Sequence, residues 1–172
     1  VNLPFTGQYA RLRALREDWR PRHIVIDATG VGAGLASFLL RGSEGTQVHP
    51  FVFSSASKSR LGWDFLAILD TGRWREFRAE TPPNNDEQSA LQALFFRQLR
   101  SCQSELRPGP DKRMRWGVPE GLRDPHNGEI LHDDLVFSAA LAAVIDRDLT
   151  GEPAETLIIP AADPLRDLDR GF

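Results

Sequence analysis

The sequence is poor in cysteine, in lysine and in long apolar runs. One cysteine, Cys102, occurs in 172 residues, which excludes an internal disulfide framework and a cysteine-based zinc site. No apolar run approaches the ~20 residues of a membrane helix, and the N-terminal segment lacks the basic-then-apolar layout of a signal peptide. We therefore expect a protein of the reducing cytoplasm that has no membrane span.

Positive charge is carried almost entirely by arginine. Lys58 and Lys112 are the only lysines, and the formal net charge is -3. From Asp146 onward there are seven acidic residues and three arginines, so the rest of the chain is near +1. Arginine suits bidentate contacts with phosphate, although heavy use of arginine is also typical of a GC-rich genome. The negative net charge therefore does not exclude nucleic acid as a partner.

Composition and patterning predict one globular α/β domain. Hydrophobic residues make up 41% and charged residues 26% of the chain, as in ordinary globular proteins. Strand-like and helix-like segments alternate over residues 1–149, which predicts an α/β fold. Residues 150–172 contain five Pro or Gly residues and no strong period. We expect them to form an acidic C-terminal extension.

Apolar spacing predicts the individual elements. Three-and-four spacing predicts a helix over residues 8–19, and an apolar face predicts one over 85–102. Helices ended by glycine are predicted over 33–40 and 57–69. A buried helix is predicted over 134–145, where the residues are small or apolar nearly all round. The helix over 85–102 would be capped by Asn85 or Asp86, and its apolar face would hold Leu91, Leu94, Phe95, Leu99 and Cys102. The run 23–27 predicts a strand buried on both faces. Residues 47–54 predict a second strand, which Pro50 places at an edge or a bulge, and residues 73–78 predict a short strand.

A basic hairpin is predicted around the turn at residues 108–111. Its cations are Arg107, Lys112, Arg113 and Arg115. Arg113 and Arg115 should share one face, with Met114 and Trp116 on the other. Such a surface suits contact with a phosphate backbone. A solvated edge strand protected by charge explains the pattern equally well.

An acidic residue ends the first predicted strand. Asp27 is followed by a glycine cluster at Gly30, Gly32 and Gly34. Because ligands bind at the carboxyl ends of parallel strands, Asp27 would lie on the floor of a crevice. It could instead cap the following helix, with Thr29 assisting. A nucleotide-binding turn is a further alternative, although the dinucleotide fingerprint requires glycine where Leu35 stands.

A second acidic pair opens the last predicted helix. Asp133 and Asp134 lie at the predicted helix N-terminus, where acidic residues stabilise a helix by complementing its dipole. This structural role could explain the pair without a function. Hard cations such as Mg²⁺ take carboxylate oxygens from separate elements, so Asp27 and this pair could share metal ions. Two such ions could activate a water for phosphodiester cleavage. His132 could be a ligand, a proton shuttle or a loop residue, and Lys58, where a loop enters a helix, could hold a phosphate or be a solvated lysine.

Three stretches, in this order and spacing, resemble the C-terminal nuclease domain of tailed-phage and prophage large terminase subunits. They are residues 24–39, 48–74 and 132–143, and the resemblance runs from about Tyr9 to about Ala143. The resemblance implies a ribonuclease H-like mixed sheet flanked by helices, with a small auxiliary hairpin. It implies a hydrolase that cleaves double-stranded viral DNA during packaging with Mg²⁺ or Mn²⁺, two ions in the complete domain. It also implies the portal protein and the small terminase subunit as partners, in the cytoplasm of a bacterial host.

By position, the resemblance assigns roles to the candidate residues. Asp27 would be the catalytic metal ligand at the strand end, and Asp133 or Asp134 would be the ligand at the helix start. His132 and Lys58 would be auxiliary residues. The hairpin, with Arg107, Lys112, Arg113 and Arg115, would lie beside DNA.

One catalytic strand of that family has no counterpart here. Its aspartate precedes the matched segments, so we expect residues 1–149 to be a partial domain, either from a longer protein or from a degenerate prophage gene. A catalytically inactive module for DNA binding or packaging assembly is therefore a second hypothesis. A nucleotide-binding α/β protein is the third.

Overall fold

The computed structural model describes residues 3–42, 45–76 and 87–149. Within them the elements follow the order α1–β1–α2–β2–α3–α4–β3–β4–α5–α6, so the expected α/β class is confirmed. None of the helices in these ranges combines the length and the apolar character that crossing a bilayer requires. The expected extension at 150–172 and the expected caps Asn85 and Asp86 lie outside the described residues.

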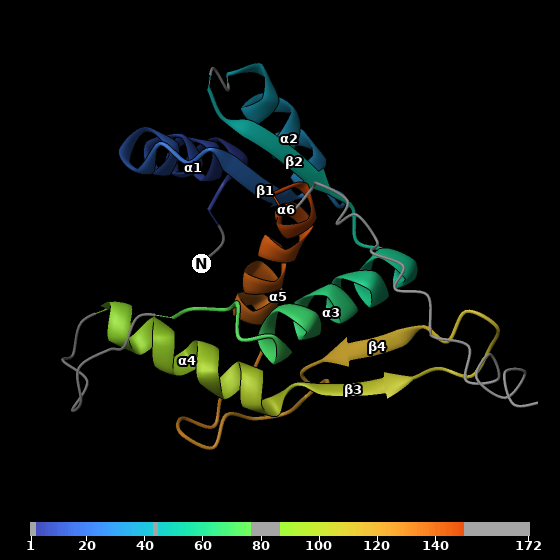
Figure 1. Ribbon diagram of the computed structural model, residues 1–172. Coiled ribbons are helices and arrows are strands. Elements are labelled where there is room, and N and C mark those ends of the chain that lie inside the picture. The colour runs from blue at the N-terminus through green and yellow to red at the C-terminus, as the bar shows by residue number, and fades with distance from the viewer. Residues whose placement is uncertain (1–2, 43–44, 77–86, 150–172) are drawn as a thin grey trace, which may run out of the picture.

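The N-terminal half pairs two parallel strands beside two helices (Figure 1). Its elements are α1 (Phe5–Trp19), β1 (His23–Asp27), α2 (Gly32–Arg41) and β2 (Gln47–Phe51). Ile24 lies opposite Val48 and Asp27 opposite Phe51. The expectation that β1 is buried on both faces is wrong, because residues 23–26 are half-buried and Asp27 is exposed. In the described part of the chain β2 is the only strand beside β1, which leaves the second edge of β1 without a neighbouring strand.

Pro50 lies on the outer edge of β2. The Gln47 N–H donates to Arg22 O (2.8 Å) and Phe51 O accepts from the Ala28 N–H (2.7 Å). Alternate peptide groups of β2 therefore face β1, and those of Pro50 face away from it. Proline lacks the N–H that an inward position would need, so the expected edge placement is confirmed.

The C-terminal half packs helices around the hairpin. Its elements are α3 (Ser55–Asp70), α4 (Glu87–Ser101), β3 (Gln103–Leu106), β4 (Met114–Gly117), α5 (Asp134–Ala140) and α6 (Ala142–Leu149). β3 and β4 are antiparallel, which confirms the expected hairpin. The buried core lies between α3, α4, β4 and the two last helices, and consists of Leu61, Phe65, Ile68, Phe95, Met114, Trp116, Val136, Ala140 and Ala143.

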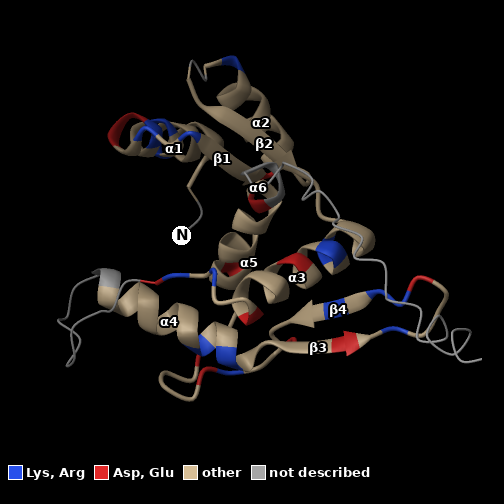
Figure 2. Ribbon diagram, viewed as in Figure 1, with Lys and Arg blue, Asp and Glu red and all other residues tan. Residues whose placement is uncertain are grey.

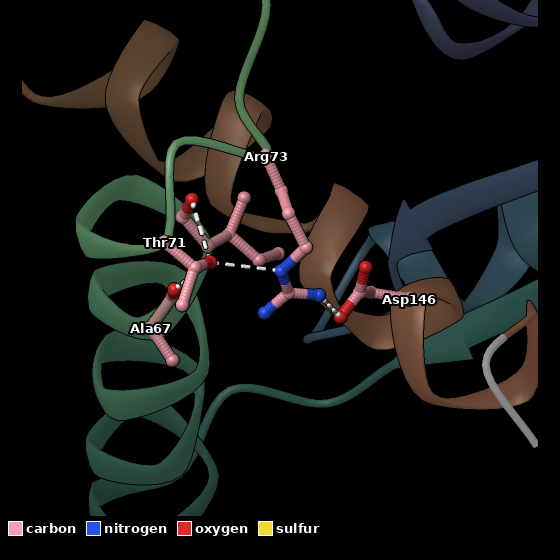
Figure 3. A network of polar contacts seen from close by, with 5 residues as sticks. Ala67, Thr71, Arg73 and Asp146 are labelled. Atoms are coloured by element: carbon pink, nitrogen blue, oxygen red, sulfur yellow. Dashed lines mark hydrogen bonds and ion pairs between the residues drawn. The ribbon is translucent and has the colours of Figure 1, made fainter.

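Helix α6 joins the two halves. It packs against α3 and against β1, and Figure 1 shows α5 and α6 as one column between the halves. Figure 3 shows the polar contacts at this junction: Arg73 Nε donates to Thr71 Oγ1 (2.9 Å), and the same guanidinium pairs with Asp146 of α6. Thr71 in turn caps the end of α3 by bonding Ala67 O.

The single helix expected over 134–145 is instead two helices separated by Leu141. The Leu141 N–H still donates to Phe137 O (3.0 Å), whereas the Val144 N–H donates to Leu141 O, only three residues back (3.1 Å). This tighter bond interrupts the α-helical ladder without reversing the chain. The column therefore continues through Leu141, but its two segments are not one α-helix.

Two smaller expectations are also wrong. Residues 73–76 form no strand, because Arg73 is held by side-chain contacts rather than by a neighbouring strand; residues 77–78 lie outside the described part. Leu91 is exposed, because it lines an open hollow beside Trp74 and Leu135 instead of entering the core.

Candidate metal and nucleic-acid site

Lys58 is positioned by the start of α3. The Ser54 hydroxyl accepts from the Ser57 N–H (3.1 Å), and the Ser57 hydroxyl accepts from the Ser54 N–H (2.8 Å). In this reciprocal cap Ser57 takes the position that Glu or Gln more often fills. Lys58 is half-buried in the first turn, and its Nζ lies 4.1 Å from the centroid of the Phe137 ring, a cation–π contact. The predicted place of Lys58, where a loop enters a helix, is confirmed.

Strand β4 is fixed on α3 beside Lys58. Met114 and Trp116 are buried, as the predicted alternation requires. The Met114 N–H donates to Ser59 Oγ (2.9 Å), and Trp116 Nε1 donates to Lys58 O (2.7 Å). Gly62 leaves the space that Met114 and Trp116 fill, since a Cβ at that position would clash with both side chains.

Asp133 and Lys58 line one open pocket of about 350 Å³. The charged residues that line it are Lys58, Glu105, Arg115, Glu120 and Asp133. Asp133 is half-buried, and its Oδ2 accepts a long hydrogen bond from the Val118 N–H (3.3 Å). Gly117 has φ 139°, and a Cβ there would clash with Asp133 Oδ2. Glycine at this position therefore allows the carboxylate to lie against the end of β4.

Cys102 lies within electrostatic range of the same two charges. Burial first, and then the negative charge of Asp133, raise the pKa of its thiol from 9.0 to about 11, while Lys58 acts in the opposite direction. Burial and a nearby carboxylate both disfavour the thiolate. The pKa of Cys102 therefore responds to the charges of both Asp133 and Lys58.

Asp27 ends β1 at the carboxyl edge of the parallel pair. Its side chain is exposed, and Oδ1 accepts from the Thr29 N–H (2.8 Å). This contact orders the turn after the strand. Helix α2 begins at Gly32 after Val31, which supplies no side-chain cap. The alternative in which Asp27 caps that helix is therefore wrong, although Asp27 does stabilise the turn that leads to it.

A chain of contacts connects the turn after Asp27 with the pocket of Asp133. Thr29 Oγ1 accepts from the Phe53 N–H (2.9 Å). The Phe53 ring lies edge-on to the Phe137 ring, with centroids 5.7 Å apart. Phe137 is one helical turn beyond Asp133, and its N–H donates to Asp133 O (2.9 Å). These contacts connect the end of β1 with the first turn of α5.

The glycines after Asp27 serve packing within the chain. Gly34 lies under α1, where a Cβ would stand 3.1 Å from Cε2 of Phe5. A Cβ at Gly32 would clash with the carbonyl of Asp27. Packing within the described residues therefore explains Gly32 and Gly34 without a bound nucleotide.

The hairpin cations adjoin the pocket on its other side. A second hollow of about 220 Å³ is lined by Ser55, Lys58, Arg107, Arg113, Met114 and Arg115. Arg113 and Arg115 are exposed, and Arg113 pairs with Asp111 (2.8 Å). Figure 2 shows the basic band of β4 and the charged turn that follows β3. Lys112 lies in that turn with φ 41°, outside the lining of both hollows.

Asp134 and His132 lie apart from this arrangement. Both are exposed, and neither lines the pocket of Asp133. Asp134 is the first residue of α5 and Asp133 its N-cap residue, although the Asp133 side chain makes no capping bond. The geometry therefore favours Asp133 over Asp134 as the acid that faces the pocket.

Sequence reasoning missed Gln98 and Asp124, which are both buried. Gln98 Oε1 accepts from the Leu135 N–H (3.0 Å) and so supplies the cap that α5 lacks. Asp124 accepts from the His126 N–H (2.9 Å) and pairs with Arg97 (2.8 Å). These two partners, the His126 N–H first, hold the pKa of Asp124 below its usual range. The one signal for Gln98 was a polar residue beside the apolar face of α4.

The carboxylates fit a hard cation in their chemistry but not in number. Within the described residues, no group of three or more His, Cys, Asp or Glu side chains is arranged to hold a metal ion. Mg²⁺ is often held by one or two carboxylates together with waters and substrate phosphates, which Asp27 and Asp133 could provide once nucleic acid is bound. No family model, curated protein or solved structure matches the chain. The assignment of the candidate site therefore depends on the geometry of its residues alone.

Proposed function

We propose that this chain is the nuclease part of a terminase-type large subunit, with a ribonuclease H-like fold, that hydrolyses phosphodiesters of double-stranded DNA. The observation that carries the proposal is the shared pocket of Asp133, Lys58 and Arg115, next to a hollow lined by Arg107 and Arg113. A phosphodiesterase site needs an acidic side chain that can hold a metal ion and basic side chains that can bind the phosphates.

In this proposal Asp27 and Asp133 hold Mg²⁺ or Mn²⁺, which supplies Lewis-acid polarisation of the phosphate and a more acidic water. The chain's own cations bind and orient the substrate. Lys58 lines both hollows, and its contact with Phe137 restricts where the ammonium group lies. Arg115 also lines both hollows, so a DNA backbone that crosses from one to the other would pass these two residues. The resemblance to large terminase subunits suggests a portal protein and a small terminase subunit as partners, in a bacterial host cell.

The first test is nicking of a supercoiled plasmid in Mn²⁺ and in Mg²⁺. We expect Asp27→Asn and Asp133→Asn each to reduce the nicking rate about 100-fold or more, because each removes a carboxylate proposed to hold the metal ion that offsets the negative charge of the transition state. Asp134→Asn, which changes the same charge at the next position, is the matched control and should retain most of the rate. Thermal unfolding of each variant checks that the fold is intact. Wild-type nicking in Asp27→Asn or in Asp133→Asn would show that the assigned carboxylate is not a metal ligand.

A DNA-binding module without cleavage is the second candidate. Two observations favour it. Among the described residues, no three His, Cys, Asp or Glu side chains are grouped to hold a metal ion, whereas three arginines of the hairpin line one hollow. Duplex binding in EDTA separates the two functions. Binding that is lost in Arg107→Gln, together with no nicking by the wild-type chain, supports the module. Metal-dependent nicking excludes it.

A further inference from the structure

A separate basic hollow lies at the opposite end of the parallel strands. It has a volume of about 530 Å³ and is lined by Arg16, Arg20, Arg41, Gly42, Gly45 and Thr46. Helices α1 and α2 end there, and β1 and β2 begin there. Asp27 ends β1 at the other edge, roughly 13 Å away for a five-residue strand. The hollow is therefore distinct from the proposed nuclease site.

The described lining residues include three guanidinium groups and no acid. Arg16 donates to Gly42 O, which ties the last turn of α1 to the end of α2. Arg20 and Arg41 are exposed, and neither guanidinium takes part in an ion pair among the described residues. The ion pair on α1, between Arg13 and Glu17, involves none of the three. Figure 2 shows basic residues on α1 and at the end of α2.

Arg20 occupies a backbone conformation that favours glycine. It follows α1 with φ 45° and ψ 52°, in the left-handed region, and its N–H donates to Arg16 O (2.9 Å). Helices commonly place glycine there, because any other residue costs about 1 kcal/mol or more. A strained residue whose side chain lines a hollow is an observation from which a functional role can be inferred.

We infer that this hollow binds a phosphate group. Guanidinium forks bind phosphate oxygens in pairs, and they remain charged at all physiological pH values. Gly42 and Gly45 have no side chain, so the backbone can lie close to the bound oxygens. The ligand is either a free phosphate or a phosphodiester of nucleic acid. The inference goes beyond the proposed nuclease function and does not depend on it.

The test is thermal unfolding with increasing inorganic phosphate at constant pH and ionic strength. We expect a saturable rise in Tm for the wild-type chain, since a ligand of the folded state stabilises it. Arg20→Gly removes one guanidinium and places the preferred residue in the left-handed conformation, so the fold should be retained. Its apparent Kd for phosphate should be about 10-fold weaker, the scale of one lost charge-assisted contact. Arg41→Gln should weaken binding to a similar extent.

Arg11→Gln is the matched control, because it removes one positive charge from an exposed side chain of α1 that does not line the hollow. It should keep the wild-type Kd for phosphate. A duplex-binding measurement in EDTA, with the exposed Arg11→Gln as control, distinguishes the sources of the phosphate. Weaker duplex binding by Arg20→Gly assigns the site to nucleic acid, and an effect on inorganic phosphate alone assigns it to a free anion.

Two results would overturn the inference. One is a wild-type Kd for phosphate and for the duplex in both Arg20→Gly and Arg41→Gln. That result would mean that the arginines only complement the helix C-termini, in which case the variants change unfolding without changing binding. The other is the lack of any saturable effect of phosphate or duplex on the wild-type chain.

Discussion

At the scale of single residues, Cys102 makes the electrostatics of the candidate site measurable. The thiolate is the reactive form of cysteine, and the raised pKa of about 11 leaves little thiolate at pH values near 8.5. Iodoacetamide should therefore modify the folded chain on the order of 100-fold more slowly than the chain unfolded in urea, where the pKa is near its ordinary value. Asp133→Asn should lower the pKa of Cys102 and speed the reaction, and Lys58→Gln should slow it.

Asp134→Asn is the control for this measurement, and it should react at the wild-type rate because its side chain is exposed and outside the pocket. Equal rates for Asp133→Asn and the wild-type chain would show that Asp133 does not face Cys102. The assignment of Asp133 as the acid beside Lys58 would then lose its support.

The positions of single residues were predictable where the neighbouring sequence determines them. The serines of the capping box place Lys58, and the end of an apolar run places Asp27. The choice between Asp133 and Asp134 was not predictable. Two adjacent acids at a helix N-terminus differ only in the residues of other elements that they face. Gln98 and Asp124 were missed for the same reason, since their partners are 37 and 27 residues away in sequence.

At the scale of elements, α5 depends on a cap from another helix. Gln98 of α4 is buried and accepts from the Leu135 N–H. Gln98→Met, nearly equal in size, removes the acceptor and leaves that N–H without a partner, which should lower the free energy of unfolding by about 1–3 kcal/mol. Urea denaturation measures the loss. Arg100→Met, an exposed change on the same helix, should alter stability by less than about 0.5 kcal/mol.

If Gln98→Met were as stable as the Arg100→Met control, the cap would contribute nothing to the fold. The start of α5 would then be held by the packing of Val136 and Phe137 alone.

Helices and strands were predictable from the spacing of apolar residues and from turn residues. The places where an expected element breaks or fails to form were not. The hairpin and the alternation of Met114 and Trp116 along β4 follow from pattern alone. The break at Leu141 and the missing strand at 73–76 do not, because a tight backbone bond and the Arg73–Asp146 pair decide them. The Arg73–Asp146 pair joins residues 73 positions apart, which only the folded chain brings together.

At the scale of the whole molecule, the stability of the fold should depend on the ionisation of Asp124. Because the pKa of the folded state is lower than the ordinary 3.8, the stabilisation is present above that value and is lost as the pH falls below it. Urea unfolding of the wild-type chain should therefore show a drop in stability below about pH 4. Asp124→Asn should be less stable at neutral pH and should show a smaller drop.

The control is Asp111→Asn, since the Asp111–Arg113 pair is exposed and should contribute little. If the wild-type chain and Asp124→Asn lost stability in parallel on acidification, other carboxylates would dominate the acid response.

The class of the fold was predictable, whereas its assembly was not. The alternation of strand-like and helix-like segments predicted the α/β class. Nothing local indicated that the parallel pair and the hairpin form separate sheets, or that α6 lies against β1. Such placements depend on the total apolar surface that each element can bury against the others.

The contact between α6 and β1 also has a consequence for protein synthesis. The first strand emerges from the ribosome more than a hundred residues before the helix that covers it. Until that helix has been translated, β1 lacks part of its final cover, so the nascent chain exposes apolar strand surface that can associate with other chains. The N-terminal half would therefore need its own compaction, or a chaperone, until α6 has been synthesised.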